Sequence, residues 1–259
     1  MRLVIGLEHK SLFRAVKAGL ALIYPPQCLC CGEAVATGAG NVLLCPRCWP
    51  ETGFIGADCC DACGVPLPAA TGGEGPGDLV CDDCLRWPRA WDRGRAALTY
   101  TGAGRKLVLA LKHGDRPDLA PALGGWLAQA AAPLIRPGMI VVPVPLHLRR
   151  LLKRKYNQAD LLARRVALAH GLAHYPHLLR RTRHTASQDQ RGLSERYANL
   201  AGALAVDQCL ASRLRGRPVL LIDDVMASGA TLSEAAEKLS TAGLGPISTA
   251  VLARAVKDV

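Results

Sequence analysis

Two adjacent acids followed by a loop of small residues carry the clearest chemistry in this sequence. Asp223 and Asp224 come directly after the apolar run 218–222. The loop that follows, and the residue that opens the next helical pattern, are Ala227, Ser228, Gly229, Ala230 and Thr231. Backbone N–H groups at such a loop and helix start form an anion site. The hydroxyls would add hydrogen bonds, and the glycine would allow close approach.

The acidic pair extends this site toward a sugar. Neighbouring carboxylates suit vicinal hydroxyls and Mg²⁺. A strand ending at Asp223 and Asp224 would place them at the carboxyl edge of a sheet, where open α/β sheets bind ligands. The combination predicts a ribose 5-phosphate site. The simpler alternative is a helix capped by Ser228 or Thr231 beside a solvated acidic pair.

The cysteines form a second chemical pattern. Of the eleven, ten fall between Cys28 and Cys84, and Cys209 stands alone. Eight of them form four CxxC pairs: Cys28 and Cys31, Cys45 and Cys48, Cys60 and Cys63, Cys81 and Cys84. Two CxxC turns supply the four thiolates of a tetrahedral zinc site. We expect consecutive units to pair, which gives two structural Zn²⁺ sites with Cys30 and Cys59 spare.

Three alternatives stay open for the cysteines. The units could pair in an interleaved order, or only one site could be filled. Redox-active or unpaired thiols are the third. Because every ligand position would be taken by a cysteine, the metal is expected to be structural rather than catalytic, with its binding energy stabilising a segment poor in apolar residues.

Positive charge is concentrated in one part of the chain. Residues 146–217 hold 15 basic and 4 acidic residues and account for the whole formal excess of +11. The densest run contains Arg149, Arg150, Lys153, Arg154 and Lys155. Such a run attracts phosphates, in a ligand or in a nucleic-acid backbone, although a solubilising face is the simpler reading. Tyr156 could stack on a base or cap a helix. Lys112 could face a diphosphate or lie on the surface.

Composition and periodicity point to a folded α/β chain. Half of the 259 residues are hydrophobic, which excludes a disordered chain, and no apolar run is long enough to cross a membrane. The first 24 residues make a poor signal peptide, so we expect a cytoplasmic protein. Strand-like runs (97–102, 139–146, 177–181, 218–225, 247–256) alternate with helical ones (9–24, 104–114, 118–135, 157–172, 193–204, 231–243), which predicts a mainly parallel sheet.

The segment 219–236 resembles the 5-phosphoribosyl 1-diphosphate (PRPP) motif of type I phosphoribosyltransferases, with a departure at Ala227, where a hydroxyl residue is usual. The layout as a whole resembles the ComF family. Further matches are Lys112 in ALKHGD, the strand VVPVPLH and the run RRLLKRKYNQA. By resemblance to the related fold, residues 145–156 are expected to form a loop near the acidic-pair loop. Others lie in the polar run 181–199: Arg181, Thr185, Gln188, Leu193, Arg196 and Asn199.

The resemblance implies an N-terminal helix (1–27), a double zinc ribbon (28–91) and a type I phosphoribosyltransferase-like domain (92–259) with a parallel sheet and flanking helices. It implies a role in natural transformation, handling incoming single-stranded DNA in the cytoplasm, with Arg196 and the basic run facing DNA and a helicase-type competence protein as partner. Asp223, Asp224, Lys112 and loop 227–231 would bind PRPP with Mg²⁺. The alternative function is an active phosphoribosyltransferase in which the acidic pair takes part in transfer to a base. The acceptor and the oligomeric state are left open.

Overall fold

The computed structural model describes residues 25–35, 43–68, 79–183 and 202–256. Its contacts divide the chain into two compact units between Glu51 and Thr52, and each unit is described separately. The helix expected at 9–24 lies outside the described residues. The boundaries expected at 27/28 and 91/92 stay predictions, because they mark changes in composition, whereas the structural division reflects contacts.

The first unit is built on tight cysteine turns. The Cys28 N–H donates to the Glu33 carbonyl at 2.8 Å, and the Gly32 N–H donates to the Cys28 carbonyl at 2.9 Å. Gly32 has a φ of 76°, a conformation that a side chain would strain. The other cysteine turn of this unit ends in the short helix α2 (Cys48–Glu51).

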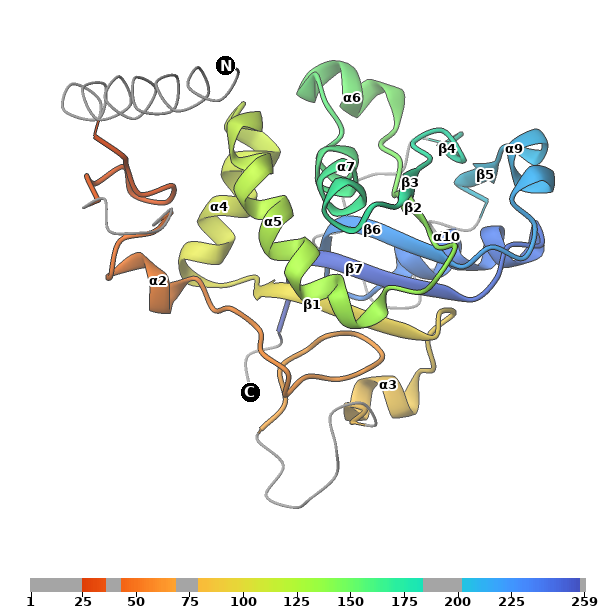
Figure 1. Ribbon diagram of the computed structural model, residues 1–259, viewed down its shortest axis with the longest axis horizontal. Coiled ribbons are helices and arrows are strands. Elements are labelled where there is room, and N and C mark those ends of the chain that lie inside the picture. Colours follow the sequence, from red (N-terminus) through yellow and green to blue (C-terminus); the bar gives the residue numbers. More distant parts are fainter. Residues whose placement is uncertain (1–24, 36–42, 69–78, 184–201, 257–259) are drawn as a thin grey trace, which may run out of the picture. The chain divides into compact units, whose positions relative to one another are not determined.

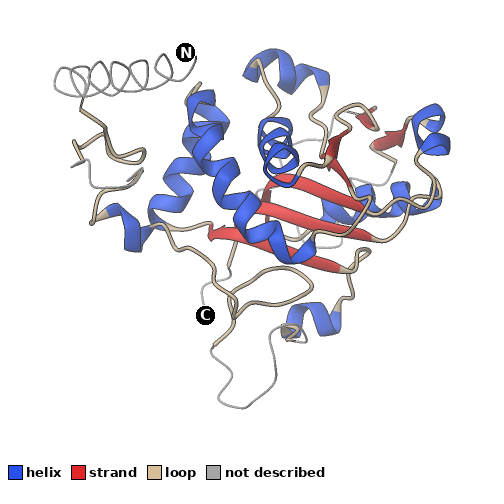
Figure 2. Ribbon diagram, viewed as in Figure 1, coloured by secondary structure: helices blue, strands red, loops and turns tan. Residues whose placement is uncertain are grey.

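A parallel five-stranded sheet forms the centre of the second unit (Figures 1 and 2). Its strands are β1 (Arg93–Thr99), β2 (Ile140–Pro143), β3 (Ala173–His174), β6 (Val219–Met226) and β7 (Ile247–Arg254). They lie in the order β1-β7-β6-β2-β3. All of β7 is buried, because both faces of such a sheet are covered. A separate antiparallel pair joins β4 (Leu179–Arg181) to β5 (Leu204–Val206).

Helices cover both faces of this sheet (Figure 1). Its order and contacts place α5 (Ala120–Ala131) and α7 (Gln158–His170) together on one face and α10 (Ala230–Thr241) on the other. A Cβ at Gly124 would lie 2.5 Å from the Arg165 Cβ, so this glycine allows α5 and α7 to pack closely. The short 3-10 turns Pro117–Leu119 and Ala132–Leu134 flank α5, and α4 (Gly102–His113) precedes it.

The predicted alternation of strands and helices is confirmed across the described part of the sheet unit, with several differences. No strand is predicted at β3, and β5 begins at Leu204, where the predicted helical run 193–204 ends; the part of that run before residue 202 lies outside the described residues. The basic run 149–155, expected to lie in a loop, belongs to α6 (Leu148–Arg154) and its end, because leucines at helical spacing alternate with the charges. A further short helix, α9 (Gln208–Arg213), begins where the Asp207 side chain accepts from the Leu210 N–H at 3.1 Å. None of the described helices is both long and apolar enough to cross a membrane.

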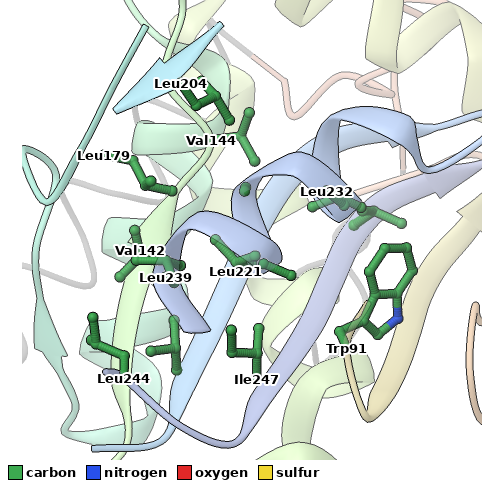
Figure 3. Close-up of a cluster of buried hydrophobic side chains, with 14 of the residues drawn as sticks. Trp91, Val142, Val144, Leu179, Leu204, Leu221, Leu232, Leu239, Leu244 and Ile247 are labelled. Carbon is green, nitrogen blue, oxygen red and sulfur yellow. The ribbon is translucent and has the colours of Figure 1, made fainter. Parts of the chain in front are cut away.

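The hydrophobic core on the α10 face of the sheet includes the second set of cysteines, which is Cys60, Cys63, Cys81 and Cys84. Leu232 and Leu239 of α10 pack over Leu221 of β6, and Trp91 lies beside Leu232 (Figure 3). Cys60, Cys63 and Cys84 are buried members of the same cluster. The second half of the cysteine region therefore contributes directly to the core of the sheet unit.

The CxxC turn between Cys60 and Cys63 is hydrogen-bonded and ion-paired to the edge strand β1. The Gly94 N–H donates to the Asp61 carbonyl at 2.7 Å, and the Asp61 carboxylate pairs with both Arg93 and Arg95. A Cβ at Gly64 would lie 2.5 Å from the Ala96 nitrogen. The close fit explains why glycine follows the CxxC pair here. The helix α3 (Asp82–Arg86) carries the last cysteine of this set.

Candidate functional site

A cavity of about 920 Å³ opens at the carboxyl edge of the sheet. Tyr100, Val144, Ala227 and Ala255 line it, and each follows the end of one of four strands. The chain leaves β2 for β3 through α7 on one face and leaves β6 for β7 through α10 on the other. The boundary between β2 and β6 is therefore a topological switch point, the usual ligand-binding position in open parallel sheets.

The acidic pair lies on β6 at this switch point, and both carboxylates line the cavity. Lys112 of α4 places its Nζ 2.9 Å from the Asp224 Oδ1. Burial, followed by the charge of Asp224, raises the pKa of Asp223 to about 7, although Lys112 and Arg181 oppose the shift. The surroundings of Asp223 thus destabilise its ionised form, and hydroxyl donors or a cation would stabilise the ionised carboxylate.

In the loop after the acidic pair, three backbone N–H groups have no hydrogen-bond acceptor among the described residues. Gly229 has a φ of 84° and precedes α10, which has no side-chain cap. The hydrogen bonds of this part of the structure include none donated by the N–H groups of Ala227, Ser228 or Gly229. Ser228 Oγ lies 3.4 Å from the Ala230 nitrogen. The anion cradle predicted from the sequence therefore has donors available, and Thr231 lines the same cavity.

Two arginines hold the carbonyl side of this loop. Arg254 is buried at the end of β7, and its Nη1 donates to the carbonyls of Met226 at 3.1 Å and Ala227 at 2.7 Å. Arg89 Nη1 donates to the Ser228 carbonyl at 2.7 Å. With three successive carbonyls tied to cations, the loop is pre-organised, which lowers the cost of ordering it around an anion.

Basic side chains form another wall of the cavity. Arg150, Arg154 and Lys155, from α6 and its end, line it with Arg181 of β4. Burial lowers the pKa of Arg181, and the neighbouring Arg150 charge lowers it further, while Asp223 opposes the shift. Two cations held near each other in a partly buried wall favour a bound anion. Lys155 Nζ is itself paired with Asp115 at 2.9 Å.

The segment after α6 fixes this wall to the sheet. The Tyr156 hydroxyl donates to the Leu111 carbonyl at 2.8 Å, and the Asn157 side chain donates to the Val144 carbonyl at 3.1 Å. The same Asn157 side chain accepts from the Ala159 N–H and caps α7. Tyr156 lines the cavity, but its hydroxyl has a structural partner, so both expectations for this residue stay compatible with the structure.

The structure brings most of the predicted site residues together. Asp223, Asp224, Lys112, Ala227 and Thr231 share the cavity, Ser228, Gly229 and Ala230 lie beside it in the loop and at the start of α10, and Arg149 and Lys153 belong to α6. Arg196 lies outside the described residues. Sequence reasoning missed Arg105 of α4, which also lines the cavity, and assigned no ligand role to Arg181, which it quoted only as a family match. No local pattern marks these side chains, because strand order brings them to the cavity.

The two sets of cysteines gather as consecutive pairing predicts. One set is Cys28, Cys31, Cys45 and Cys48, and the other is Cys60, Cys63, Cys81 and Cys84. Within each set all sulfurs lie within 4.8 Å of one another. The Sγ atoms of Cys31 and Cys45 are 3.7 Å apart, and those of Cys63 and Cys81 are 3.8 Å apart. A tetrahedral zinc with bonds of about 2.3 Å separates its sulfurs by about 3.8 Å, so both sets fit structural zinc ribbons.

Removing the lysine at the acidic pair should destabilise the sheet unit. The side chains of Lys112 and Asp224 are only 20% and 12% exposed, and Lys112→Met leaves Asp224 without its cation. We expect the free energy of unfolding at neutral pH to fall by about 1–3 kcal/mol, measured by urea denaturation. Adding Asp224→Asn should recover part of the loss, and a fully additive double variant would show that the pair is not coupled.

Family models match two parts of the chain. Residues 19–85 match the double zinc ribbon domain, and residues 180–258 match the phosphoribosyl transferase domain. The two cysteine sets lie in the first match, and the acidic pair with its loop lies in the second. The chain is thus a double zinc ribbon protein with a phosphoribosyltransferase-like domain.

Sequence relatives give the family. The chain is 30% identical over 240 residues to the DNA utilization protein YhgH of Salmonella typhi, covering 91% of this chain and 93% of the relative. It is 31% identical over 184 residues to Competence protein F of Haemophilus influenzae, covering 68% of this chain and 78% of the relative. The chain belongs to the ComF family, and these two relatives are named for DNA utilization and for competence.

A solved structure of glutamine PRPP amidotransferase from B. subtilis superposes with a TM-score of 0.38 and 20% identity. The superposition covers 55% of this chain and 30% of that one.

Proposed function

We propose that this protein handles single-stranded DNA in the cytoplasm during DNA uptake and that its cavity binds PRPP or a related ribose phosphate. The observation that carries the proposal is one cavity that joins an acidic pair, a loop with available N–H groups and an arginine wall. The names of two relatives, a DNA utilization protein and a competence protein, support the DNA role. A helicase-type competence protein is the partner that this role implies.

Different residues of the cavity would bind different groups of the ligand. The N–H groups of Ala227, Ser228 and Gly229 would bind the 5-phosphate, and Asp223 would accept hydrogen bonds from the ribose hydroxyls. Arg150 and Arg181 would face the diphosphate. The carboxylates of Asp223 and Asp224 are the oxygen donors that Mg²⁺ prefers, and the ion would neutralise diphosphate charge.

A second function, transfer of the ribose phosphate to a nitrogenous base, is favoured by one observation. The cavity volume of about 920 Å³ lies at the upper end of small-molecule sites and leaves room for an acceptor beside PRPP. Incubation with PRPP, Mg²⁺ and a panel of bases tests it: diphosphate release that depends on one base would establish transfer, and no release above the spontaneous rate with any base would argue for binding alone.

The DNA role can be tested at the arginine wall. Arg150→Gln combined with Arg154→Gln should weaken binding of fluorescent single-stranded DNA and lower the slope of log affinity against log salt by about 1.4. The measurement is fluorescence anisotropy of the zinc-loaded protein across a salt series, with and without PRPP and Mg²⁺. A PRPP-dependent change would link the cavity to DNA.

A matched control removes the same charge elsewhere. Arg213, the last residue of α9, and Arg215, which follows α9, are both exposed and lie near the end of β6 opposite to the cavity. Arg213→Gln with Arg215→Gln should leave the slope close to that of the unaltered protein. An equal loss from both double variants would assign binding to overall charge, and no binding at low salt would overturn the DNA role.

A further inference from the structure

One side chain connects the second set of cysteines to the loop after the acidic pair. Arg89 lies shortly after α3 and is partly buried. Its Nε lies 3.2 Å from the Cys84 Sγ, and its Nη1 donates to the Ser228 carbonyl at 2.7 Å. The guanidinium is planar and rigid. Two of its nitrogens therefore hold the sulfur and the carbonyl at a fixed separation, although the two residues that they contact are far apart in the sequence.

This contact sets the direction of a loop amide. In a trans peptide the carbonyl and the following N–H point in opposite directions. Because the Ser228 carbonyl is turned toward Arg89, the Gly229 N–H is turned away from it. The carbonyls of Met226 and Ala227 are held in the same way by Arg254. The orientation of the anion cradle thus depends on cations on its far side.

The packing around Arg89 connects the loop to the same set of cysteines a second time. A Cβ at Gly229 would lie 3.0 Å from both the Arg89 Nη1 and the Trp91 ring. The Arg89 guanidinium carbon is 5.7 Å from the centre of the Trp91 ring, and the Trp91 Nε1 donates to the Ala62 carbonyl at 2.7 Å. Ala62 lies between the two cysteines of a CxxC pair. The loop is therefore connected to the second cysteine set through both Arg89 and Trp91.

We propose that Arg89 is a positioning residue that couples metal binding at the second cysteine set to the orientation of the loop. The ligand part of this inference rests on the proposed function, in which the loop binds a phosphate. A metal at this set would fix the Cys84 sulfur, and through Arg89 it would fix the Ser228 carbonyl. Coupling between two binding equilibria is reciprocal, so a phosphate ligand should in turn retain the metal.

The first arm of the test needs no phosphate ligand. The Ser233 amide donates to the Gly229 carbonyl at 2.9 Å, so its hydrogen–deuterium exchange reports the order of the loop. In the zinc-loaded full chain, Arg89→Met should speed this exchange about tenfold, and Arg89→Lys should restore it only in part. The control Arg86→Met removes a nearby exposed arginine, at the end of α3, and should leave exchange unchanged.

Zinc content, measured in parallel, separates coupling from unfolding. Arg89→Met should keep the same zinc per chain as the unaltered protein, which shows that both cysteine sets are intact. If zinc is lost from Arg89→Met, the same exchange is read in Arg89→Lys. Exchange at the unaltered rate in both Arg89 variants would overturn the proposal.

The second arm measures the coupling with PRPP and Mg²⁺. Titration calorimetry should show about tenfold weaker binding by Arg89→Met than by Arg86→Met. The fraction of zinc released to a chromogenic chelator at equilibrium should fall with PRPP in the unaltered protein and not in Arg89→Met. If the unaltered protein binds no PRPP, the proposed function fails while the exchange measurement still decides the coupling. If PRPP binds and zinc release does not respond, reciprocal coupling is overturned.

Discussion

Cys63→Ser is expected to lower the free energy of unfolding of the sheet unit by more than about 3 kcal/mol, because a structural zinc in a small ribbon contributes about 10–16 kcal/mol of apparent binding energy. Cys63 is fully buried in the core that contains Leu232 and Val251. A lost thiolate there weakens the metal site and the packing around it together. Urea denaturation followed by far-UV circular dichroism measures the effect, with zinc content determined on the same samples.

Cys45→Ser is the matched control for this prediction. Cys45 is equally a buried member of a four-cysteine set, but it belongs to the other compact unit. We expect it to release one zinc and to leave the main unfolding transition of the sheet unit in place. Equal destabilisation by both changes would contradict the separation of the two units, and no effect from Cys63→Ser would contradict a structural metal at the second set.

Asp223→Asn should weaken PRPP binding about 100-fold and stabilise the protein at alkaline pH. The loss of affinity follows because charge-assisted hydrogen bonds contribute about 1.5–3 kcal/mol each, and ribose hydroxyls and Mg²⁺ would lose an ionised acceptor. Titration calorimetry with PRPP and Mg²⁺ measures this part. The opposite effect on stability follows from the burial that raises the pKa of Asp223 to about 7.

The pH dependence of the stabilisation has a definite sign. An acid whose pKa is higher in the folded than in the unfolded chain costs stability when it ionises, so the cost is absent near pH 4 and grows until about pH 7. Asp223→Asn removes it and should therefore raise the free energy of unfolding by about 1–3 kcal/mol at pH 8. Little change is expected at pH 4. Thermal or urea unfolding at the two pH values provides the measurement.

An exposed carboxylate serves as the control for this pair of effects. Asp118 is paired with Arg116 at the surface, with its side chain 58% exposed. An exposed pair of this kind contributes little to stability, so Asp118→Asn should change neither PRPP binding nor the pH dependence appreciably. A stability gain from Asp223→Asn that is the same at pH 4 and pH 8 would show that ionisation is not its cause.

Local patterns were sufficient for much of the fold. Apolar periodicity located β6, β7 and α7, because a buried helix face or a buried strand requires apolar residues at regular spacing along the local sequence. It did not locate α6, where Leu151 lies among many positive charges and the family resemblance suggested a loop. The short strand β3 has two residues, too few for any period to be visible.

The sequence by itself determined that eight cysteines form four CxxC units, and that Asp223 and Asp224 lie near the end of a strand before a loop of small residues. The tertiary structure decided that consecutive CxxC units share a site. Only the tertiary structure decided that Lys112 pairs with Asp224, that Arg89 joins Cys84 to Ser228, and that the second cysteine set belongs to the core of the sheet unit. These contacts join residues far apart in the chain. They depend on the strand order β1-β7-β6-β2-β3, and periodicity carries no information about which strands become neighbours.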